Sequence, residues 1–395
     1  MRIALYTTSA MYPPELFETV SGHVQVALKT VELLVQAGHD VTLVTTEAPA
    51  NYGIPPIFAL SGVKVRTVKK ATKAWPKHHT FSFVKAAQQV QQLYKLMSSN
   101  EFDAVHFIGS NKTAHLLGFL KLLGLKKKSG ATLVLFSEAV RSPVQAIESL
   151  LLGKLDCITT LTEFSKSRLL SKGAKHVTVT RPGVIRDLNV KDLKPFRVRP
   201  EAKGMVLFWR DATLRNGADI ALEVFRKLSS EFPEIDFVFA VRPNMLPHEP
   251  FSKLLPEINL EYKNIHLMVH PYPEGVTLGC LLASAACVVL PFRLMSINPQ
   301  FAVLETLIAG APLITTNVES NPELGEHGRT FILTNPNSVD ETLEAVRKVL
   351  NNPEESQAMG RLAMKEVPLK WNWDSYLASL LDAYSEVGEG NSNLR

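Results

Sequence analysis

Short apolar runs alternate along this chain with stretches in which apolar residues recur at helical spacing. The first run, RIALYTT, is typical of a buried strand, and a helix from Ser21-Gly22 to about residue 37 follows it. A second apolar run at residues 40–45 completes a strand–helix–strand unit. Continuous apolar runs are typical of parallel strands that are covered on both faces, so the pattern predicts an α/β protein.

The same alternation continues to the C-terminal part of the chain. Further strands are predicted at residues 63–68, 103–108, 131–136, 157–161 and 176–180, and then at 205–209, 235–240, 265–269, 287–290 and 313–316. A stretch rich in proline and charge at residues 188–203 separates two well-patterned halves. We therefore expect two Rossmann-like domains, residues 1–187 and 200–370, and a disordered tail at 388–395.

The stretch from residue 288 to 324 is the most informative part of the sequence. Asn298-Pro299 is typical of a helix start, with Asn as the cap and Pro at the first helical position. Because Pro299 has no N–H, the helix start would offer the amides of Gln300 and Phe301 to a diphosphate. Glu305 follows in the second turn, near enough to reach a ribose hydroxyl. Strand, turn, helix and strand in this order predict a phosphate site at the carboxyl ends of the strands.

The sequence LETLIAGAPLITTNVESNPEL resembles the donor-site signature of GT-B glycosyltransferases, in particular the GT4-like retaining family, glycosyltransferase group 1. Glu305 matches the family's second glutamate, which implies that it holds the ribose of a nucleotide sugar. Ile297 occupies the slot of the first glutamate, which in the family contacts hydroxyls of the donor sugar. The resemblance also implies that Asn321 and the backbone of residues 318–320 lie over the sugar.

The resemblance extends to two basic positions and a base-reading position in the second half. Arg210 matches the first of two basic residues that neutralise the leaving diphosphate in the family. For the second basic position, the spacing from Arg210 favours Arg215, whereas alignment on Gly217 favours Asn216. Because only a cation can neutralise the charge of the diphosphate, we assign this position to Arg215. His270 stands where the family reads the nucleotide base. An alternative is that these arginines only solvate a loop.

In the first half the resemblance is weaker. The family's Gly-Gly pair after the first strand corresponds to Ser21-Gly22, of which only Gly22 permits close backbone approach to the donor. Glu138 follows Ser137 where many relatives have a histidine that faces the sugar, so no catalytic histidine is carried over. His106 is either an acceptor-side residue with Ser21 and Glu138 or a satisfied core histidine.

The resemblance implies the GT-B architecture, in which two Rossmann-like domains with parallel sheets face each other across a cleft. The first domain binds the acceptor and the second binds the donor. The aromatic-rich segment at residues 371–387 resembles the terminal helix that returns to the first domain.

Composition agrees with a cytoplasmic protein. The chain has 395 residues, a formal charge of +5 and pI near 8.9, which is too weakly basic to indicate nucleic acid. Cys157, Cys280 and Cys287 lack metal-ligand spacing and are expected to be buried thiols. We expect neither a signal peptide nor a membrane span, because the apolar run at residues 278–290 is too short to cross a bilayer.

A leucine-rich helix at residues 111–125 ends in Lys126-Lys127-Lys128, and a second basic segment with aromatic residues covers residues 64–85. One interpretation is peripheral membrane contact or a site for an anionic or lipid-linked acceptor. The other, which we favour, is a core helix followed by solvated lysines, because leucine stripes at helical spacing are usually core.

The leading hypothesis is a metal-independent glycosyltransferase that needs no cofactor, takes a nucleotide-diphosphate sugar as donor and, by resemblance, retains configuration. The acceptor is open: a saccharide, a lipid-linked molecule or a small molecule. Two other hypotheses remain. The substitution at Ile297 fits a non-catalytic nucleotide-sugar-binding subunit, and Glu138 with His106 would suit a nucleotide-sugar epimerase.

Overall fold

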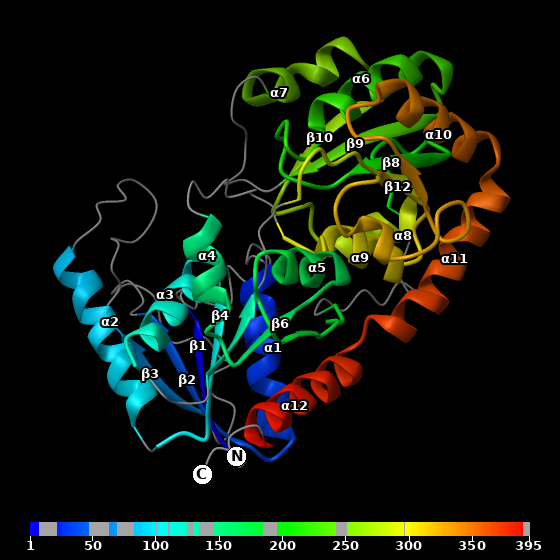
Figure 1. Ribbon diagram of the computed structural model, residues 1–395. Helices are drawn as coiled ribbons and strands as arrows, with labels where there is room; N and C mark the ends of the chain where they lie inside the picture. Colours follow the sequence, from blue (N-terminus) through cyan, green and yellow to red (C-terminus); the bar gives the residue numbers. More distant parts are fainter. Residues whose placement is uncertain are drawn as a thin grey trace. The chain divides into compact units, whose positions relative to one another are not determined.

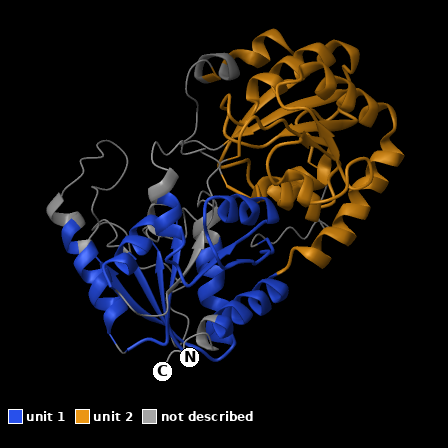
Figure 2. Ribbon diagram, viewed as in Figure 1, with its two compact units in different colours: residues 1–185, 373–395 blue, residues 186–372 orange. Residues whose placement is uncertain are grey.

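The computed structural model describes residues 1–7, 22–46, 63–68, 83–99, 101–109, 111–124, 129–133, 145–184, 196–241, 251–295 and 297–389. The chain divides into two compact units (Figures 1 and 2). Unit 1 comprises Met1–Ile185 and Trp373–Arg395, and unit 2 comprises Arg186–Asn372. Each unit is built around its own parallel sheet.

Unit 1 contains a parallel sheet in the order β3-β2-β1-β4-β5-β6-β7. Its strands are β1 (Arg2–Thr7), β2 (Asp40–Thr46), β3 (Lys64–Val68), β4 (Ala104–Gly109), β5 (Ser129–Leu133), β6 (Cys157–Thr160) and β7 (Val177–Val179). Its helices are α1 (Gly22–Gln36), α2 (Phe83–Ser98), α3 (Asn111–Leu122), α4 (Gln145–Leu152), α5 (Glu163–Ser171) and α12 (Trp373–Glu389). The strand order reverses between β1 and β4, as in other doubly wound sheets.

Helix α12, the last in the chain, packs into the core of unit 1 through polar contacts as well as apolar ones. The hydroxyl groups of Tyr376 and Thr30 lie 2.7 Å apart, and Tyr376 is fully buried. Trp373 donates its Nε1–H to the carbonyl of Val184 at 2.9 Å. Residues more than 300 positions apart in sequence therefore share one core. The helix also includes Gly388, which the sequence assigns to the tail.

Unit 2 contains a parallel sheet in the order β10-β9-β8-β11-β12-β13. Its strands are β8 (Gly204–Phe208), β9 (Ile235–Val241), β10 (Ile265–Val269), β11 (Ala285–Leu290), β12 (Leu313–Thr316) and β13 (Ile332–Thr334). Its helices are α6 (Ala218–Glu231), α7 (Phe251–Glu261), α8 (Leu278–Ser284), α9 (Phe301–Ile308), α10 (Val339–Asn351) and α11 (Pro353–Lys370), with a 3₁₀ turn η4 (Asn321–Glu323). Two doubly wound units confirm the predicted fold class.

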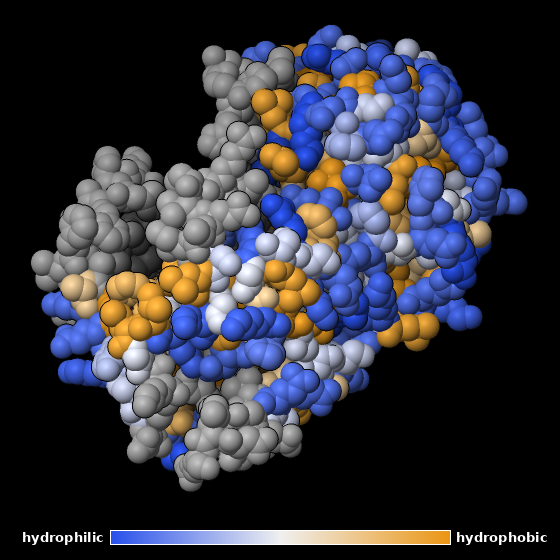
Figure 3. Space-filling view, viewed as in Figure 1, coloured by the Kyte–Doolittle hydropathy of each residue, from blue (hydrophilic) through white to orange (hydrophobic). Residues whose placement is uncertain are grey.

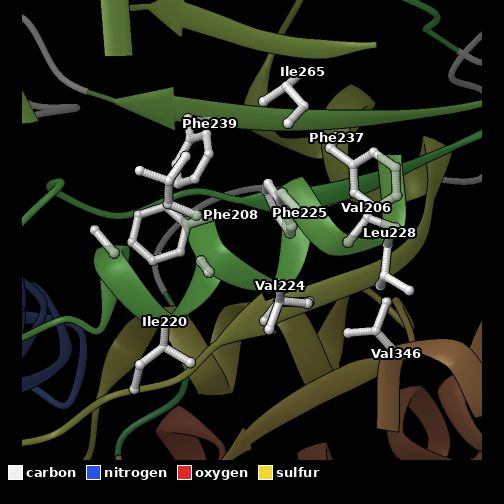
Figure 4. Packing of buried hydrophobic residues seen from close by; sticks show 14 of the residues in the cluster. Val206, Phe208, Ile220, Val224, Phe225, Leu228, Phe237, Phe239, Ile265 and Val346 are labelled. Atoms are coloured by element: carbon white, nitrogen blue, oxygen red, sulfur yellow. The ribbon is translucent and has the colours of Figure 1, made fainter. Parts of the chain in front are cut away.

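The core of unit 2 lies between one face of the sheet and helices α6 and α10 (Figure 4). The ring of Phe225 on α6 packs 5.2 Å from that of Phe237 and 4.9 Å from that of Phe239, both on β9. Burying aromatic rings of this size stabilises the unit by roughly 2–3 kcal/mol each. The packed sheet that results is rigid and fixes the positions of the loops at the carboxyl ends of its strands.

At the amino-terminal ends of the unit 2 strands, a buried carboxylate connects neighbouring segments. Asp236, with 1% of its surface exposed, accepts hydrogen bonds from Nε of Arg199 at 2.5 Å and from Nε2 of His266 at 3.1 Å. Burial alone would raise the pKa of Asp236, but the bonds from His266 and Arg199 outweigh it and lower the pKa. This contact fastens the segment before β8 to β9 and β10.

Some predictions from the sequence are corrected by the structure. The strand predicted at residues 287–290 begins earlier: β11 covers Ala285–Leu290 and follows at once after the short helix α8, which Thr277 caps. The leucine-rich helix α3 buries Leu117 and Leu120 but exposes other apolar side chains. The three cysteines are buried free thiols, as predicted. Among the helices that the structure describes, none has the length and apolar character needed to cross a membrane.

Candidate functional site

The predicted site residues of unit 2 lie where the strand order reverses. Strand β8 lies beside β11, and the chain proceeds from them toward opposite edges of the sheet. In open parallel sheets, ligands bind outside the carboxyl ends of strands at such a reversal, because the following loops diverge there. The loops after β8, β11 and β12 therefore form the candidate site.

The loop after β8 carries the predicted basic residues. Arg210 comes two residues after the end of the strand and is half-buried. Arg215 is also half-buried, and its Nη2 donates to the carbonyl of Met295 at 2.6 Å. Asn216 is buried and its Nδ2 donates to the carbonyl of Asp211 at 2.8 Å, so this amide fixes the shape of the loop. The cationic role of Arg215 stays a prediction.

A glycine lets this loop approach the end of β11. Gly217 has φ of +75°, and a Cβ atom there would lie 1.9 Å from the carbonyl oxygen of Pro291. The amide of Arg293 also donates to the carbonyl of Arg215 at 2.9 Å, and the Arg293 guanidinium pairs with Asp219. Only glycine fits this left-handed, crowded position. The two loops at the strand reversal are thereby held in contact.

The predicted helix start at Asn298-Pro299 is wrong. Helix α9 begins at Phe301 with Gln300 as its N-cap residue, and Gln300 makes no side-chain capping bond. Asn298 does not cap because its carboxamide is bound elsewhere: Nδ2 donates to Glu319 Oε2 and Oδ1 accepts from Ser320 Oγ, each at 2.6 Å. The first free amides of the helix therefore belong to Phe301 and the residues after it.

Helix α9 is attached to the end of β8 through a buried hydrogen bond. Trp209 Nε1–H donates to Thr306 Oγ1 at 3.1 Å, and Thr306 in turn donates to the carbonyl of Ala302 at 2.7 Å. Trp209 precedes Arg210, and Thr306 follows Glu305, so this bond brings the two predicted segments together. Glu305 has 3% of its surface exposed. A carboxylate buried to this degree needs polar partners.

The loop after β12 completes the candidate site. Thr315 and Thr316 donate their hydroxyls to the carbonyls of Leu290 and Phe292, at 2.7 and 2.5 Å. Asn321 is fully buried, and its Nδ2 donates to the carbonyl of Thr316 at 3.0 Å. These bonds join the ends of β11 and β12. Asn321 thus lies at the carboxyl ends of the strands, where its hydrogen bond holds the loop after β12 in place.

The remaining predicted donor residues occupy the flanks of the site. Ile297 has 6% of its surface exposed and lies next to Asn298. Gln300 is buried and its Nε2 lies 3.8 Å from the sulfur of Met295. His270 follows β10, two strands from β8, and its half-buried ring lies 5.3 Å from that of Tyr272. An aromatic pair at this position suits stacking on a planar group.

Of the two interpretations of His106, an acceptor-side residue or a core histidine, the structure supports the core histidine. His106 lies on β4 with 1% of its surface exposed, and its Nδ1 is 2.5 Å from the hydroxyl of Tyr384 on α12. Burial lowers the pKa of His106 to about 3, so the ring is a neutral core group. Gly22 is the first residue of α1. Ser21 and Glu138 lie outside the described residues.

Helices α3 and α4 of unit 1 expose an apolar face, whose atoms gather on the surface in Figure 3. It consists of Phe119 and Leu122 from α3, Leu123 just after α3, and Leu150 from α4, exposed by 47%, 45%, 62% and 49%. The helices pack closely, since a Cβ on Gly118 would lie 2.3 Å from the carbonyl oxygen of Leu151. Helix α3 thus buries Leu117 and Leu120, as expected of a core helix, and also carries exposed apolar residues.

Three contributors to the unit 2 site were missed at the sequence level. Arg293 orients the first loop, the Trp209–Thr306 bond fixes α9, and Glu319 reaches Asn298. Thr306 and Glu319 lie within the motif that suggested the family, whereas Arg293 and Trp209 lie outside it. In the described parts of the chain, no three His, Cys, Asp or Glu side chains gather as metal ligands would.

The arrangement of two doubly wound units, each around its own parallel sheet, defines a class of fold, that of the GT-B proteins. Residues 190–366 match the family model described as glycosyl transferases group 1. An uncharacterized glycosyltransferase of Methanocaldococcus jannaschii is 22% identical, with 97% of this chain and 98% of that one covered. Residues 190–366, most of unit 2, are therefore similar to glycosyltransferase group 1, and the two doubly wound units have the GT-B fold, as the sequence resemblance predicted.

Closer matches are local. A GDP-mannose-dependent alpha-(1-6)-phosphatidylinositol monomannoside mannosyltransferase of Mycobacterium tuberculosis is 34% identical over 79 residues, 20% of each chain. The chain thus aligns with only about a fifth of this relative's length. Among solved structures, sucrose-phosphate synthase from Thermosynechococcus elongatus has a TM-score of 0.72 at 15% identity, covering 99% and 100% of the chains. Anabaena HepE in complex with UDP has 0.68 at 10% identity, with both chains fully covered.

Proposed function

We propose that this protein is a glycosyltransferase that takes its sugar from a nucleotide-diphosphate donor bound at the strand reversal of unit 2. The observation that supports this most is the joining of three loops by buried hydrogen bonds around two half-buried arginines. Loops fixed before the ligand arrives lose little entropy on binding. Two guanidinium groups at one carboxyl edge suit a diphosphate better than a neutral ligand.

In this proposal Arg210 and Arg215 stabilise the charge that develops on the leaving group. The bond between the sugar's anomeric carbon and the β-phosphate oxygen breaks, and the acceptor oxygen bonds to that carbon on the same face. The acceptor proton passes to the departing phosphate, which completes the balance without a protein base. Stabilisation by the two arginines requires neither a metal ion nor a cofactor.

Glu305 would hold the ribose and His270 would lie against the base. Glu305 is joined to the phosphate region through its neighbour Thr306, whose hydroxyl binds Trp209 at the end of β8. The similar proteins point to different carriers: one is named for GDP-mannose, and a structural neighbour is in complex with UDP. The carrier of this chain is therefore best identified by direct binding.

Two alternatives share the donor site. An epimerase would need acid and base groups near the sugar, and the buried, neutral His106 is not available for this task. A non-catalytic subunit would bind the donor and turn nothing over; the apolar side chain of Ile297 at the first-glutamate slot is its best support.

A donor panel distinguishes these functions. The full chain is incubated with UDP-glucose, GDP-mannose and ADP-glucose, without acceptor and with EDTA, and released nucleoside diphosphate is measured. Slow release of one diphosphate with retained sugar configuration supports a metal-independent retaining transferase. Binding without release supports the subunit, an epimeric nucleotide sugar supports the epimerase, and abolition by EDTA contradicts metal independence.

We also propose that the apolar face of α3 and α4 contacts an anionic lipid surface. In the sequence, Lys126-Lys127-Lys128 begins four residues after the end of α3, and basic residues outnumber acidic ones in unit 1, whereas the reverse holds in unit 2. Apolar side chains flanked by lysines suit an interface with anionic lipid. Leu122→Glu should abolish co-sedimentation with anionic vesicles. Leu260→Glu, on the exposed surface of unit 2, should not; equal binding by both variants contradicts the contact.

A further inference from the structure

Glu319 stands out in the candidate site because its backbone adopts a conformation that favours glycine. Its φ is +48°, and among the described non-glycine residues only Asn337 also has positive φ. Asn adopts the left-handed region readily, but Glu does not, and the cost is about 1 kcal/mol. A strained residue that keeps a long charged side chain indicates a function for that side chain.

The side chain of Glu319 is held beside the Ile297 position. Its Oε2 accepts from Nδ2 of Asn298 at 2.6 Å, and Asn298 is fixed in turn by Ser320 Oγ at 2.6 Å. Asn298 has 1% of its surface exposed, whereas Glu319 is only half-buried. The carboxylate of Glu319 therefore has a defined position beside Asn298, the residue that follows Ile297. Because Glu319 is half-buried, part of its side chain is accessible to a ligand.

We infer that Glu319 supplies the carboxylate that binds hydroxyl groups of the donor sugar, in place of the glutamate that is absent at Ile297. A carboxylate accepts strong hydrogen bonds from hydroxyls, which the apolar side chain of Ile297 cannot do. It repels a diphosphate, so its favourable contacts are with the uncharged sugar part of the donor. This inference rests on the proposed function and names the group that selects the sugar.

The test compares binding of a nucleotide sugar with binding of its bare diphosphate. Calorimetry gives the dissociation constants of UDP-glucose and UDP, and of GDP-mannose and GDP, for the wild-type chain and Glu319→Gln. We expect Glu319→Gln to raise the dissociation constant of the nucleotide sugar about tenfold and that of the diphosphate by less than twofold. The tenfold change corresponds to about 1.4 kcal/mol of binding free energy. Glu326→Gln, at an exposed carboxylate after the same loop, should change neither.

A glycine variant separates this role from a structural one. Glu319→Gly removes the left-handed strain together with the hydrogen bond to Asn298, and these two effects oppose each other, so its melting temperature should stay close to that of the wild type. Its selective loss of sugar affinity should match that of Glu319→Gln. Equal weakening of sugar and diphosphate, or no weakening, overturns the role of Glu319 alone. If the wild-type chain binds none of the nucleotide sugars, both the inference and the proposed function are overturned.

Discussion

The two units have sheets of the same kind but use buried polar side chains differently. In unit 1 the polar pairs His106–Tyr384 and Thr30–Tyr376 fasten the last helix of the chain to the sheet. In unit 2 the polar pairs Trp209–Thr306, Asn298–Glu319 and Asn321–Thr316 join loops at one end of the sheet.

This difference indicates which polar groups serve assembly and which serve a site. Buried polar networks are costly unless they are satisfied, and their position is therefore informative. In unit 1 they lie in the core beneath a helix, where they specify packing. In unit 2 the three pairs named above lie at the strand reversal, where they fix loops around half-buried arginines, whereas the buried Asp236 lies at the other end of the sheet. The following predictions separate the two uses, beginning with the largest effect.

Removing Arg210 should affect chemistry far more than stability. We expect Arg210→Ala to lower the rate of diphosphate release from the donor by about 100-fold or more, because one well-placed charged donor contributes on that order to a transition state. The melting temperature should change little. Arg361→Ala, an exposed arginine on α11, is the matched control. Similar rates for the two variants would remove Arg210 from the site.

Removing Asp236 should do the opposite. Asp236→Ala leaves Arg199 and His266 without their shared carboxylate, and we expect a loss of about 3 kcal/mol in unfolding free energy. The folded-state pKa of Asp236 is lowered, so its contribution is present above about pH 4 and disappears as the pH falls. Chemical denaturation measures the loss. Diphosphate affinity of the folded variant should be unchanged, since Asp236 lies at the other end of β9.

His106 should make unit 1 sensitive to acid. The folded state keeps the ring neutral with a pKa of about 3, whereas the unfolded chain takes up a proton below about pH 6.5. Stability should therefore fall by about 2 kcal/mol between pH 7 and pH 5. Hydrogen exchange of unit 1 peptides measures this fall. The double variant His106→Leu/Tyr384→Phe should flatten it, and an unchanged slope would assign the acid sensitivity elsewhere.

Loss of the Tyr376 hydroxyl should have the smallest effect. Tyr376→Phe leaves the Thr30 hydroxyl with its bond to the carbonyl of Val26, so we expect a loss of about 1 kcal/mol. Donor turnover should be unaffected. Equilibrium denaturation and the diphosphate-release assay check the two statements together; a turnover defect larger than twofold would show that α12 influences the site.

Much of the fold was predictable because buried parallel strands appear in the sequence as continuous apolar runs. Strands β10 and β12 were placed to the residue, since turn residues bound them on both sides. The helix start at Asn298 was misplaced because the Asn side chain has a tertiary partner, Glu319, that local sequence rules do not include. His106 was ambiguous for the same reason, since its partner Tyr384 is 278 residues away.

Binding of a nucleoside diphosphate to the full chain tests the central claim most directly. Titration calorimetry with UDP, GDP and ADP would be carried out on the wild type, on Arg210→Ala and on Arg210→Ala/Arg215→Ala. We expect one of the three diphosphates to bind at a single site, with an affinity that falls about 100-fold or more when both arginines are removed. Failure of every diphosphate to bind, or equal affinity in the wild type and the double variant, would contradict it.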